Sequence, residues 1–568
     1  MRINLFVIRE QDSRMPSHFT LRMQFGPHRN PEEITDQLLR LVREAPIDEV
    51  MFFYFGEELN DGHETLERLR LWIDASRPYR DALKKAGVAI SLNPWHSMLH
   101  CDRGRKLKPG QNWQRMVDPA GREAGAVVCC LDPGWQAYYF ETLRLYAKEG
   151  FRVVWIDDDI RYHNHDPLHW GGCFCPGHVA EFGKRAGVSA TREEIVKACL
   201  RPGTPHPWRN IWMDMWQETI LTFLIACRRI LESSGTRMGL MSSSMEAHAA
   251  EGRQWGEWWQ AFAGGRPPVH RPHFWPYSDT IGPSLIHGIA ALDQNRTIQP
   301  ACLESGPEIE NFPYGRWNKS FRQTFAQIAV AHILGSGSLN ISLFDFMGNQ
   351  LDDEPERVAF LKSARPDMDW LADNFPMSLK SQGVGVPWSE NMGRLMHTKE
   401  GKSWYELHCP SRSWSYWLGA AGIAFSSAPR DCVNALSGPL AHCFDDATLT
   451  QWLASGLLLD GEALAILMER GFGKWLGVES VRFVTQEETC YSIEECRDPD
   501  FARRAGGQIS VNIGNHMRRL LQAELRDGAN VISVLRGPAG EVVGHGAFTF
   551  QNTLGGRVAV VPWDAGAD

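Results

Sequence analysis

Arg152-Val-Val-Trp-Ile-Asp157-Asp-Asp159-Ile-Arg-Tyr162 is the stretch from which we interpret the fold. Residues 153–156 form a short apolar run, which is typical of a buried strand. The run leads directly into three consecutive carboxylates. In α/β barrels the functional side chains follow the carboxyl ends of the strands. We therefore expect a buried strand here, with acid chemistry at its carboxyl end.

Similar apolar runs recur along the first 375 residues and alternate with amphipathic helical segments. One such segment is 31–43, where Asn30 can cap the helix and Pro31 suits its first turn. The expected strands are residues 3–8, 50–55, 88–92, 153–156, 238–241, 269–275, 298–303 and 339–344. Eight strands alternating with helices predict a (β/α)8 TIM barrel over residues 1–375.

The pattern changes after the barrel. Short apolar runs at 384–387, 417–425 and 456–461 alternate with helical segments at 446–454 and 462–470. This predicts a doubly wound, flavodoxin-like α/β domain over residues 376–490. From 491 to 568, short runs separated by Gly and Asn predict a small C-terminal β domain of sandwich type.

Composition limits the classes of function. The chain has 568 residues, a net charge of -9 and no Lys/Arg block, so we expect no nucleic-acid partner. Its apolar runs are too short for a membrane span, and its first apolar run is too short for a secretory signal. Thirteen cysteines without disulfide-scaffold spacing favour reduced thiols and a cytoplasmic location. Twenty-two tryptophans favour a carbohydrate ligand, because flat rings stack on sugars.

The three carboxylates allow several chemistries. Because side chains alternate along extended chain, Asp157 and Asp159 would share one face and Asp158 would take the other. Crowded like charges raise the pKa of at least one member, as a general acid requires. A bound divalent cation and hydrogen bonds to sugar hydroxyls are competing uses. Further candidates that follow expected strands and could bind the sugar are Glu57, Trp95, His96, Arg161, Glu246, His248, Trp275, Tyr277, Trp317 and Asp345.

Two motifs, Ile156-Asp157-Asp158-Asp159 and the stretch from Ala301 to Pro307, resemble motifs of the family 42 β-galactosidases, which are retaining glycosidases built on (β/α)8 barrels. In that family the fourth strand ends in Asn-Glu, and here Asp158 and Asp159 stand in those places. The seventh strand of the family ends in a nucleophilic Glu with Gly-Pro a few residues on. The similar motif here is Ala301-Cys-Leu-Glu304-Ser-Gly-Pro307. The resemblance implies that Glu304 is the nucleophile and Asp159 the acid/base.

The function implied by this resemblance is a retaining, exo-acting glycoside hydrolase that cleaves a terminal β-linked sugar, a galactoside or related glycoside. Such an enzyme places its two carboxyl groups roughly 5 to 5.5 Å apart. The alternatives are a glycosidase or transglycosidase for another sugar, and a barrel that binds carbohydrate without catalysis. No cofactor is expected for catalysis. The second domain is similar to the family's trimerisation domain, which implies a homotrimer.

A possible metal site follows the three carboxylates. Cys173-x-Cys175-x-x-His178, with Cys129 or Cys130 upstream, offers sulfur and nitrogen ligands at close spacing. Four such ligands are typical of a closed, tetrahedral zinc site with a structural role. The resembled family often carries a similar cluster of cysteines. The alternative is a group of buried thiols beside a histidine.

Overall fold

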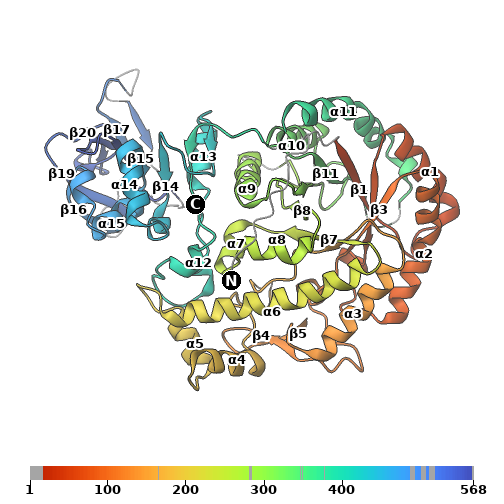
Figure 1. Ribbon diagram of the computed structural model, residues 1–568. Coiled ribbons are helices and arrows are strands. Elements are labelled where there is room, and N and C mark those ends of the chain that lie inside the picture. The colour runs from red at the N-terminus through yellow and green to blue at the C-terminus, as the bar shows by residue number, and fades with distance from the viewer. Residues whose placement is uncertain are drawn as a thin grey trace.

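The structure, a computed structural model, describes residues 17–163, 166–279, 284–345, 347, 349–376, 378–485, 493–500, 507–510 and 519–565. Its N-terminal part is a closed barrel of parallel strands (Figure 1). In spatial order the sheet runs β10-β11-β1-β2-β3-β6-β7-β8-β9. The bounds are β1 (His18–Gln24), β2 (Glu49–Tyr54), β3 (Ala89–Pro94), β6 (Val153–Ile156), β7 (Arg237–Ser242), β8 (Val269–Pro272), β9 (Glu304–Ser305), β10 (Glu308–Glu310) and β11 (Ser338–Ser342).

The barrel closes through an interrupted seventh strand. β9 pairs with β8, and β10 pairs with β11, with Gly306 and Pro307 between the two short pieces. Counting β9 and β10 as one strand gives eight, so the predicted barrel is confirmed.

Helices surround the sheet, as the alternating pattern predicts. They are α1 (Pro31–Glu44), α2 (Leu66–Lys85), α3 (Pro133–Ala147), α6 (Pro207–Glu232), α8 (Trp255–Ala263), α9 (Ser284–Ile298), α10 (Phe321–Ile333) and α11 (Pro355–Asn374). In α1 the Asn30 side chain accepts a hydrogen bond from the Glu32 N–H, and Pro31 lies in the first turn. The hairpin β4 (Arg115–Val117) and β5 (Glu123–Val128), and the helices α4 (Pro176–Ala186), α5 (Arg192–Cys199) and α7 (Met245–Ala250), are added to this plan.

Two strands differ from their predicted positions. Residues 3–8 lie outside the described part of the chain, and β1 begins at His18 instead. Residues 298–303 do not form the seventh strand, because α9 continues to Ile298 and a turn follows. The strand begins at Glu304, whose N–H bonds to the Pro268 carbonyl. Glu304 therefore lies at the amino end of the strand and Glu310 at its carboxyl end.

The second domain is a largely parallel sheet flanked by helices. Its sheet order is β13-β12-β14-β15-β24-β23-β20. The strands are β12 (Val384–Gly385), β13 (Phe425–Ser426), β14 (Asn434–Leu436), β15 (Gly456–Leu459), β20 (Asn530–Val531), β23 (Phe548–Gln551) and β24 (Arg557–Val560); the helices are α12 (Met392–Leu395), α13 (Ser413–Ala420), α14 (Asp446–Ser455) and α15 (Gly461–Glu469).

The C-terminal residues contribute to this second sheet. β24 pairs in parallel with β15, so the last strand crosses the predicted boundary at residue 490. The other C-terminal strands form small antiparallel sheets: β16 (Val478–Thr485), β17 (Ile493–Cys496), β18 (Gln508–Ser510), β19 (Arg519–Leu525), β21 (Ser533–Arg536) and β22 (Val542–His545).

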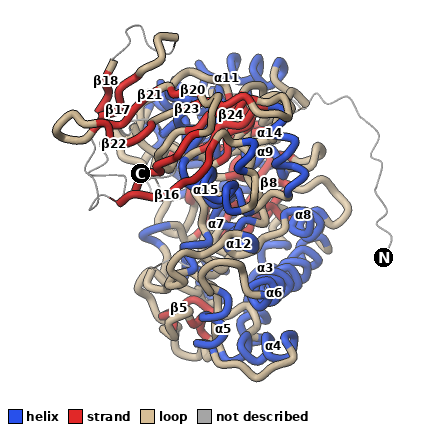
Figure 2. Tube along the Cα trace, turned by 90° about the vertical axis from the view of Figure 1, so that its left-hand side faces the viewer, coloured by secondary structure: helices blue, strands red, loops and turns tan. Residues whose placement is uncertain are grey.

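The second domain packs on the barrel. Helix α12 lies beside α7 (Figure 2), and the Arg394 guanidinium pairs with Asp214 of α6 at 2.6 Å. The Trp388 indole N–H donates to the Thr297 hydroxyl at the end of α9. The second domain therefore borders the end of the barrel that carries α7. Within the described residues, no helix combines the length and apolar character needed to cross a membrane.

Candidate active site

Two carboxyl groups project from the seventh strand at the barrel mouth. Glu308 and Glu310 are both buried and, being two residues apart on β10, share one face. Arg271 of β8 bridges them: one Nη pairs with Glu308 at 3.0 Å and the other with Glu310. Arg22 of β1 also pairs with Glu310. Two guanidinium groups thus converge on the carboxyl end of this strand.

The surroundings separate the pKa values of the two carboxyl groups. Burial raises the pKa of Glu308 well above its usual range, and the nearby charge of Glu310 adds to this effect. Burial also acts on Glu310, but Arg22 and Arg271 outweigh it and hold the pKa of Glu310 low. Tyr314 donates its hydroxyl hydrogen to Glu310 at 2.9 Å. Glu308 therefore favours the neutral form and Glu310 the carboxylate.

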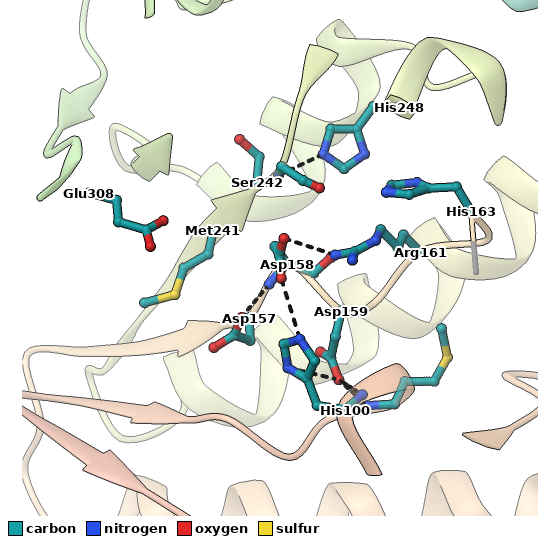
Figure 3. A network of polar contacts seen from close by, with 12 residues as sticks. His100, Asp157, Asp158, Asp159, Arg161, His163, Met241, Ser242, His248 and Glu308 are labelled. Carbon is teal, nitrogen blue, oxygen red and sulfur yellow. Dashed lines mark hydrogen bonds and ion pairs between the residues drawn. The ribbon is translucent and has the colours of Figure 1, made fainter. Parts of the chain in front are cut away.

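A second carboxyl pair follows the fourth strand. The Asn93 amide donates to Asp157 Oδ2 at 2.7 Å, and the Asp158 N–H donates to Asp157 Oδ1. Burial raises the pKa of Asp157 to about 6, and the neighbouring Asp158 and Asp159 charges contribute. Asp158 is more open, with 28% of its side chain exposed, and it pairs with Arg161 at 2.9 Å (Figure 3).

Arg22 connects the two carboxyl centres. Besides pairing with Glu310, it donates to the Asn93 side-chain oxygen at 3.1 Å. Asn93 in turn donates to Asp157. Figure 3 shows the Glu308 carboxyl pointing toward the side of the barrel where Asp157 and Met241 lie. A continuous polar chain therefore joins the carboxyl ends of the fourth and seventh strands.

Asp159 is not part of this mouth. Its side chain is fully buried, and Oδ2 accepts the backbone N–H groups of Met98 (2.7 Å) and His100 (3.0 Å). The chain turns directly after β6, so the expected alternation, with Asp157 and Asp159 on one face, is wrong. Asp159 holds the loop after β3 in place, and Asp157 and Asp158 face the mouth.

Glu304 lies at the opposite end of the barrel. It pairs with Arg152 (2.8 Å), which precedes β6, and with Arg237 (2.7 Å), the first residue of β7. Both arginines are at amino ends of strands, the face of a barrel that serves stability and not catalysis. The expectation that Glu304 and Asp159 meet at the mouth is therefore wrong.

Several predicted binding residues do lie around the mouth. Trp95 stacks on His100 with ring centroids 4.3 Å apart, and the Tyr277 hydroxyl donates to Glu308 at 2.7 Å. Arg161 pairs with Asp158 as described. Trp275, three residues after β8, is 40% exposed, and Trp317, seven residues after β10, is 92% exposed. These rings and donors suit contacts with a sugar.

Other predicted residues have structural contacts instead. His96 is buried with its ring edge-on to Phe55 at 4.5 Å, and His248 is buried with Nδ1 3.2 Å from Glu251. Asp345 accepts the Met347 N–H and caps its own loop.

The remaining two predicted residues are Glu57 and Glu246. Glu57 follows β2, and burial raises its pKa while Arg103 opposes the effect. Glu246, at the start of α7, is fully buried and pairs with Arg412 of the second domain.

Five residues of the polar chain were absent from the candidates found by sequence: Arg22, Asn93, Arg271, Glu308 and Glu310. Arg22 in β1 and Arg271 in β8 are buried arginines within strands, and a buried charge is itself a signal of a paired position. Glu308 and Glu310 were missed because the strand was placed six residues too early.

Four predicted metal ligands converge beside the loop after β6. The Sγ atoms of Cys129, Cys173 and Cys175 and one ring nitrogen of His178 all lie within 4.8 Å of one another, and all four residues are buried. Cys130 is not part of the group, because its Sγ contacts the Met98 sulfur at 3.3 Å.

The spacing of these ligands suits a tetrahedral ion. His178 Nδ1 is 3.3 Å from both Cys129 Sγ and Cys175 Sγ, and the two sulfurs are 3.5 Å apart. Zinc–ligand distances of about 2.0–2.3 Å would give ligand separations of about 3.5–3.8 Å, close to those found. His178 Nε2 lies 3.1 Å from the Tyr162 hydroxyl, which orients the ring with Nδ1 toward the sulfurs.

Several solved structures have a fold similar to that of this chain. A β-galactosidase from Rahnella sp. R3 superposes with a TM-score of 0.59 at 13% identity, covering 97% of this chain and 86% of that one. The values for a β-galactosidase from Bacillus circulans sp. alkalophilus are the same. A β-galactosidase from Halorubrum lacusprofundi gives 0.55 at 12% identity, covering 96% and 87%. The chain has the fold of these β-galactosidases.

The likeness extends over the barrel and the C-terminal domains together, because nearly the whole chain is covered. At 13% identity this likeness shows the fold alone. No protein-family model matches the sequence, and no curated protein matches it.

Proposed function

We propose that this chain is a glycoside hydrolase that removes a terminal β-linked sugar with retention of anomeric configuration. The observation that carries the proposal is the pair of carboxyl centres at the carboxyl ends of the fourth and seventh strands, joined through Arg22 and Asn93. A retaining glycosidase needs one ionised carboxylate and one carboxylic acid on either side of the scissile bond.

Glu310 is the nucleophile in this proposal. Arg22, Arg271 and the Tyr314 hydroxyl keep it ionised and fix its orientation. Its carboxylate attacks the anomeric carbon and forms a glycosyl ester as the bond to the leaving oxygen breaks. Water then cleaves the ester, which restores the carboxylate and releases the sugar.

Asp157 is the acid and then the base. Its raised pKa, about 6, leaves it partly protonated near neutral pH, so it can donate a proton to the leaving oxygen. As a carboxylate it then takes a proton from the attacking water. Asp158 and Arg161 would bind sugar hydroxyls, and Trp95, Trp275 and Trp317 offer stacking surfaces.

Chemical rescue tests both assignments. A β-galactoside with a p-nitrophenyl leaving group is the first substrate, because the structures of like fold are β-galactosidases; aryl β-glucosides and β-arabinosides follow. We expect Glu310→Ala to lose turnover and to recover it with azide, giving the α-glycosyl azide. Asp157→Ala with azide should give the β-azide. Turnover of the activated substrate by Glu310→Ala without azide at the wild-type rate would contradict the assignment.

A barrel that binds sugar without cleaving it is the second candidate. The residue in the family's acid/base place, Asp159, is fully buried and bonded to backbone N–H groups. Calorimetric binding of sugars by wild type, with no release of nitrophenol from any aryl glycoside, would favour this candidate over hydrolysis.

We also propose that Cys129, Cys173, Cys175 and His178 hold a structural zinc ion. The cluster joins the end of β5 to the start of α4, so the ion would fix the long loop after β6. All four ligands come from protein, which assigns the ion no part in catalysis. The implied homotrimer remains a further proposal.

A further inference from the structure

The second domain forms one wall of the barrel mouth. Trp170, in the loop after β6, has its ring edge-on to Tyr405 and His408 of the second domain, with centroids 5.1 and 5.7 Å apart. Trp404 packs on Trp216 of α6 at 5.6 Å. The segment from Trp404 to Arg412 therefore runs along the fourth- and fifth-strand side of the mouth.

Arg412 is held in place at the end of this segment. Its Nε–H donates to Glu246 Oε1 at 2.7 Å, and the Ser411 hydroxyl donates to the same oxygen at 2.9 Å. Gln294 of α9 fixes Ser411 through a further hydrogen bond of 2.7 Å. Glu246 belongs to α7, which begins three residues after β7 ends. One edge of the guanidinium is thus anchored to the barrel mouth.

The other edge of Arg412 is available to a ligand. Among the described residues, Glu246 is the only hydrogen-bond or ion-pair partner found for this side chain, and 15% of the side chain is exposed. Its Nη1 and Nη2 groups therefore present two N–H donors side by side. This fork matches the two oxygens of a carboxylate or sulfate.

Arg412 and the carboxyl groups of the mouth share one neighbour, His273. His273 follows β8 and contacts Tyr277 with ring centroids 5.4 Å apart. Burial lowers the pKa of His273 to about 4; Asp158 and Glu310 oppose this, whereas Arg271 and Arg412 add to it. The charges of Arg412, Asp158 and Glu310 therefore all act on the His273 imidazole.

We propose that Arg412 makes the second domain part of the substrate site, and that the sugar carries an acidic substituent, a carboxylate or a sulfate ester, which Arg412 binds. This inference rests on the proposed glycosidase function. It names the substrate class as acidic glycosides, and it makes Arg412 a specificity-determining residue contributed by a domain outside the barrel.

Paired substrates test the inference. The p-nitrophenyl β-galactoside is compared with its β-galacturonide and 6-sulfate, which separates the two sources of negative charge. We expect wild type to have the higher kcat/KM on one of the acidic substrates. Arg412→Gln should lower that kcat/KM about tenfold or more, mainly through KM, because a charge-assisted pair is lost. The neutral substrate should change by less than about threefold.

Arg394→Ala is the matched control. Arg394 also crosses from the second domain to the barrel, but it pairs with Asp214 of α6. We expect it to leave the ratio of acidic to neutral kcat/KM unchanged. Equal losses on both substrates in Arg412→Gln, or a wild-type preference for the neutral glycoside, would overturn the inference.

Calorimetry separates this inference from the proposed function. If wild type cleaves no glycoside, the hydrolase proposal fails, but binding of free galacturonate and galactose 6-sulfate can still be compared with binding of galactose. Tighter binding of an acidic sugar that is lost in Arg412→Gln would support the inference. Equal affinity for acidic and neutral sugars, or no binding of any of them, would refute it.

Discussion

Replacing Glu304 with glutamine should lower the stability of the barrel, whereas replacing Glu310 with glutamine should lower kcat. Glu304 bonds to Arg152 and Arg237 at the closed end of the barrel, with 13% of its side chain exposed. After Glu304→Gln, Arg152 keeps Glu49, and Arg237 keeps the Pro267 carbonyl. The loss is therefore one carboxylate with two charge-assisted hydrogen bonds, which we set at about 2 kcal/mol of barrel stability.

The stability loss depends on pH with a definite sign. Burial raises the pKa of Glu304, but Arg152 and Arg237 outweigh it and hold the pKa below its usual range. A carboxyl group with a depressed folded-state pKa stabilises the protein above its unfolded-state pKa, and this contribution is lost as the pH falls through the folded value. The difference between wild type and Glu304→Gln should therefore be full at neutral pH and shrink in acid.

The effects on kcat should follow the opposite order, with a large loss in Glu310→Gln and a small one in Glu304→Gln. Glu310→Gln should lower kcat on the order of 10⁴-fold or more, the scale on which hydrolases lose rate without their nucleophile. Glu304→Gln should keep kcat within about twofold in the folded protein, because it lies outside the mouth. Initial rates on the best aryl glycoside, with thermal unfolding followed by circular dichroism, measure both quantities. A kcat loss in Glu304→Gln that matches that of Glu310→Gln would refute the placement of the nucleophile.

The other predictions concern the acid, the metal and the assembly. The Asn93 hydrogen bond lowers the pKa of Asp157, so Asn93→Ala should shift the alkaline limb of the kcat/KM profile, near pH 6, to higher pH; an unmoved limb would argue for another acid. Metal analysis should find one zinc per chain in wild type and in Cys130→Ser, and none in Cys173→Ser; equal content in both variants would exclude the cluster. Light scattering should give three times the chain mass of 64.2 kDa, and a monomer would remove the trimer.

The barrel could be predicted from sequence because its signal is repeated. Because eight short apolar runs alternate with helical segments, the barrel prediction holds even when one run is misplaced. The strand assignment at residues 3–8 could not be tested, and β1 was missed, because β1 carries Arg22 in its middle and so lacks an unbroken apolar run. The charge of Arg22 within β1 thus hid that strand from the sequence pattern.

The cluster of cysteines and His178 was predicted more completely than the carboxyl groups of the mouth. Ligand spacing in sequence is set by local geometry, so the grouping of Cys173, Cys175 and His178 followed directly. The choice between Cys129 and Cys130 depended on which side of the chain each sulfur takes. That required the backbone after β5, which turns Cys129 toward the cluster and Cys130 toward Met98.

Predicting which carboxyl groups reach the mouth depends on strand register, which the residue pattern specifies weakly here. Gly306 and Pro307 interrupt the seventh strand, so its apolar side chains are split between Leu303, in the turn before Glu304, and Ile309. A motif match to Glu-x-Gly-Pro therefore selected the carboxylate before the interruption. In a barrel a shift of six residues moves a side chain from one end to the other, about 20 Å along a strand. The ion pairs show the two positions: Glu304 pairs with arginines at amino ends of strands, and Glu310 pairs with Arg22 and Arg271 beside the mouth.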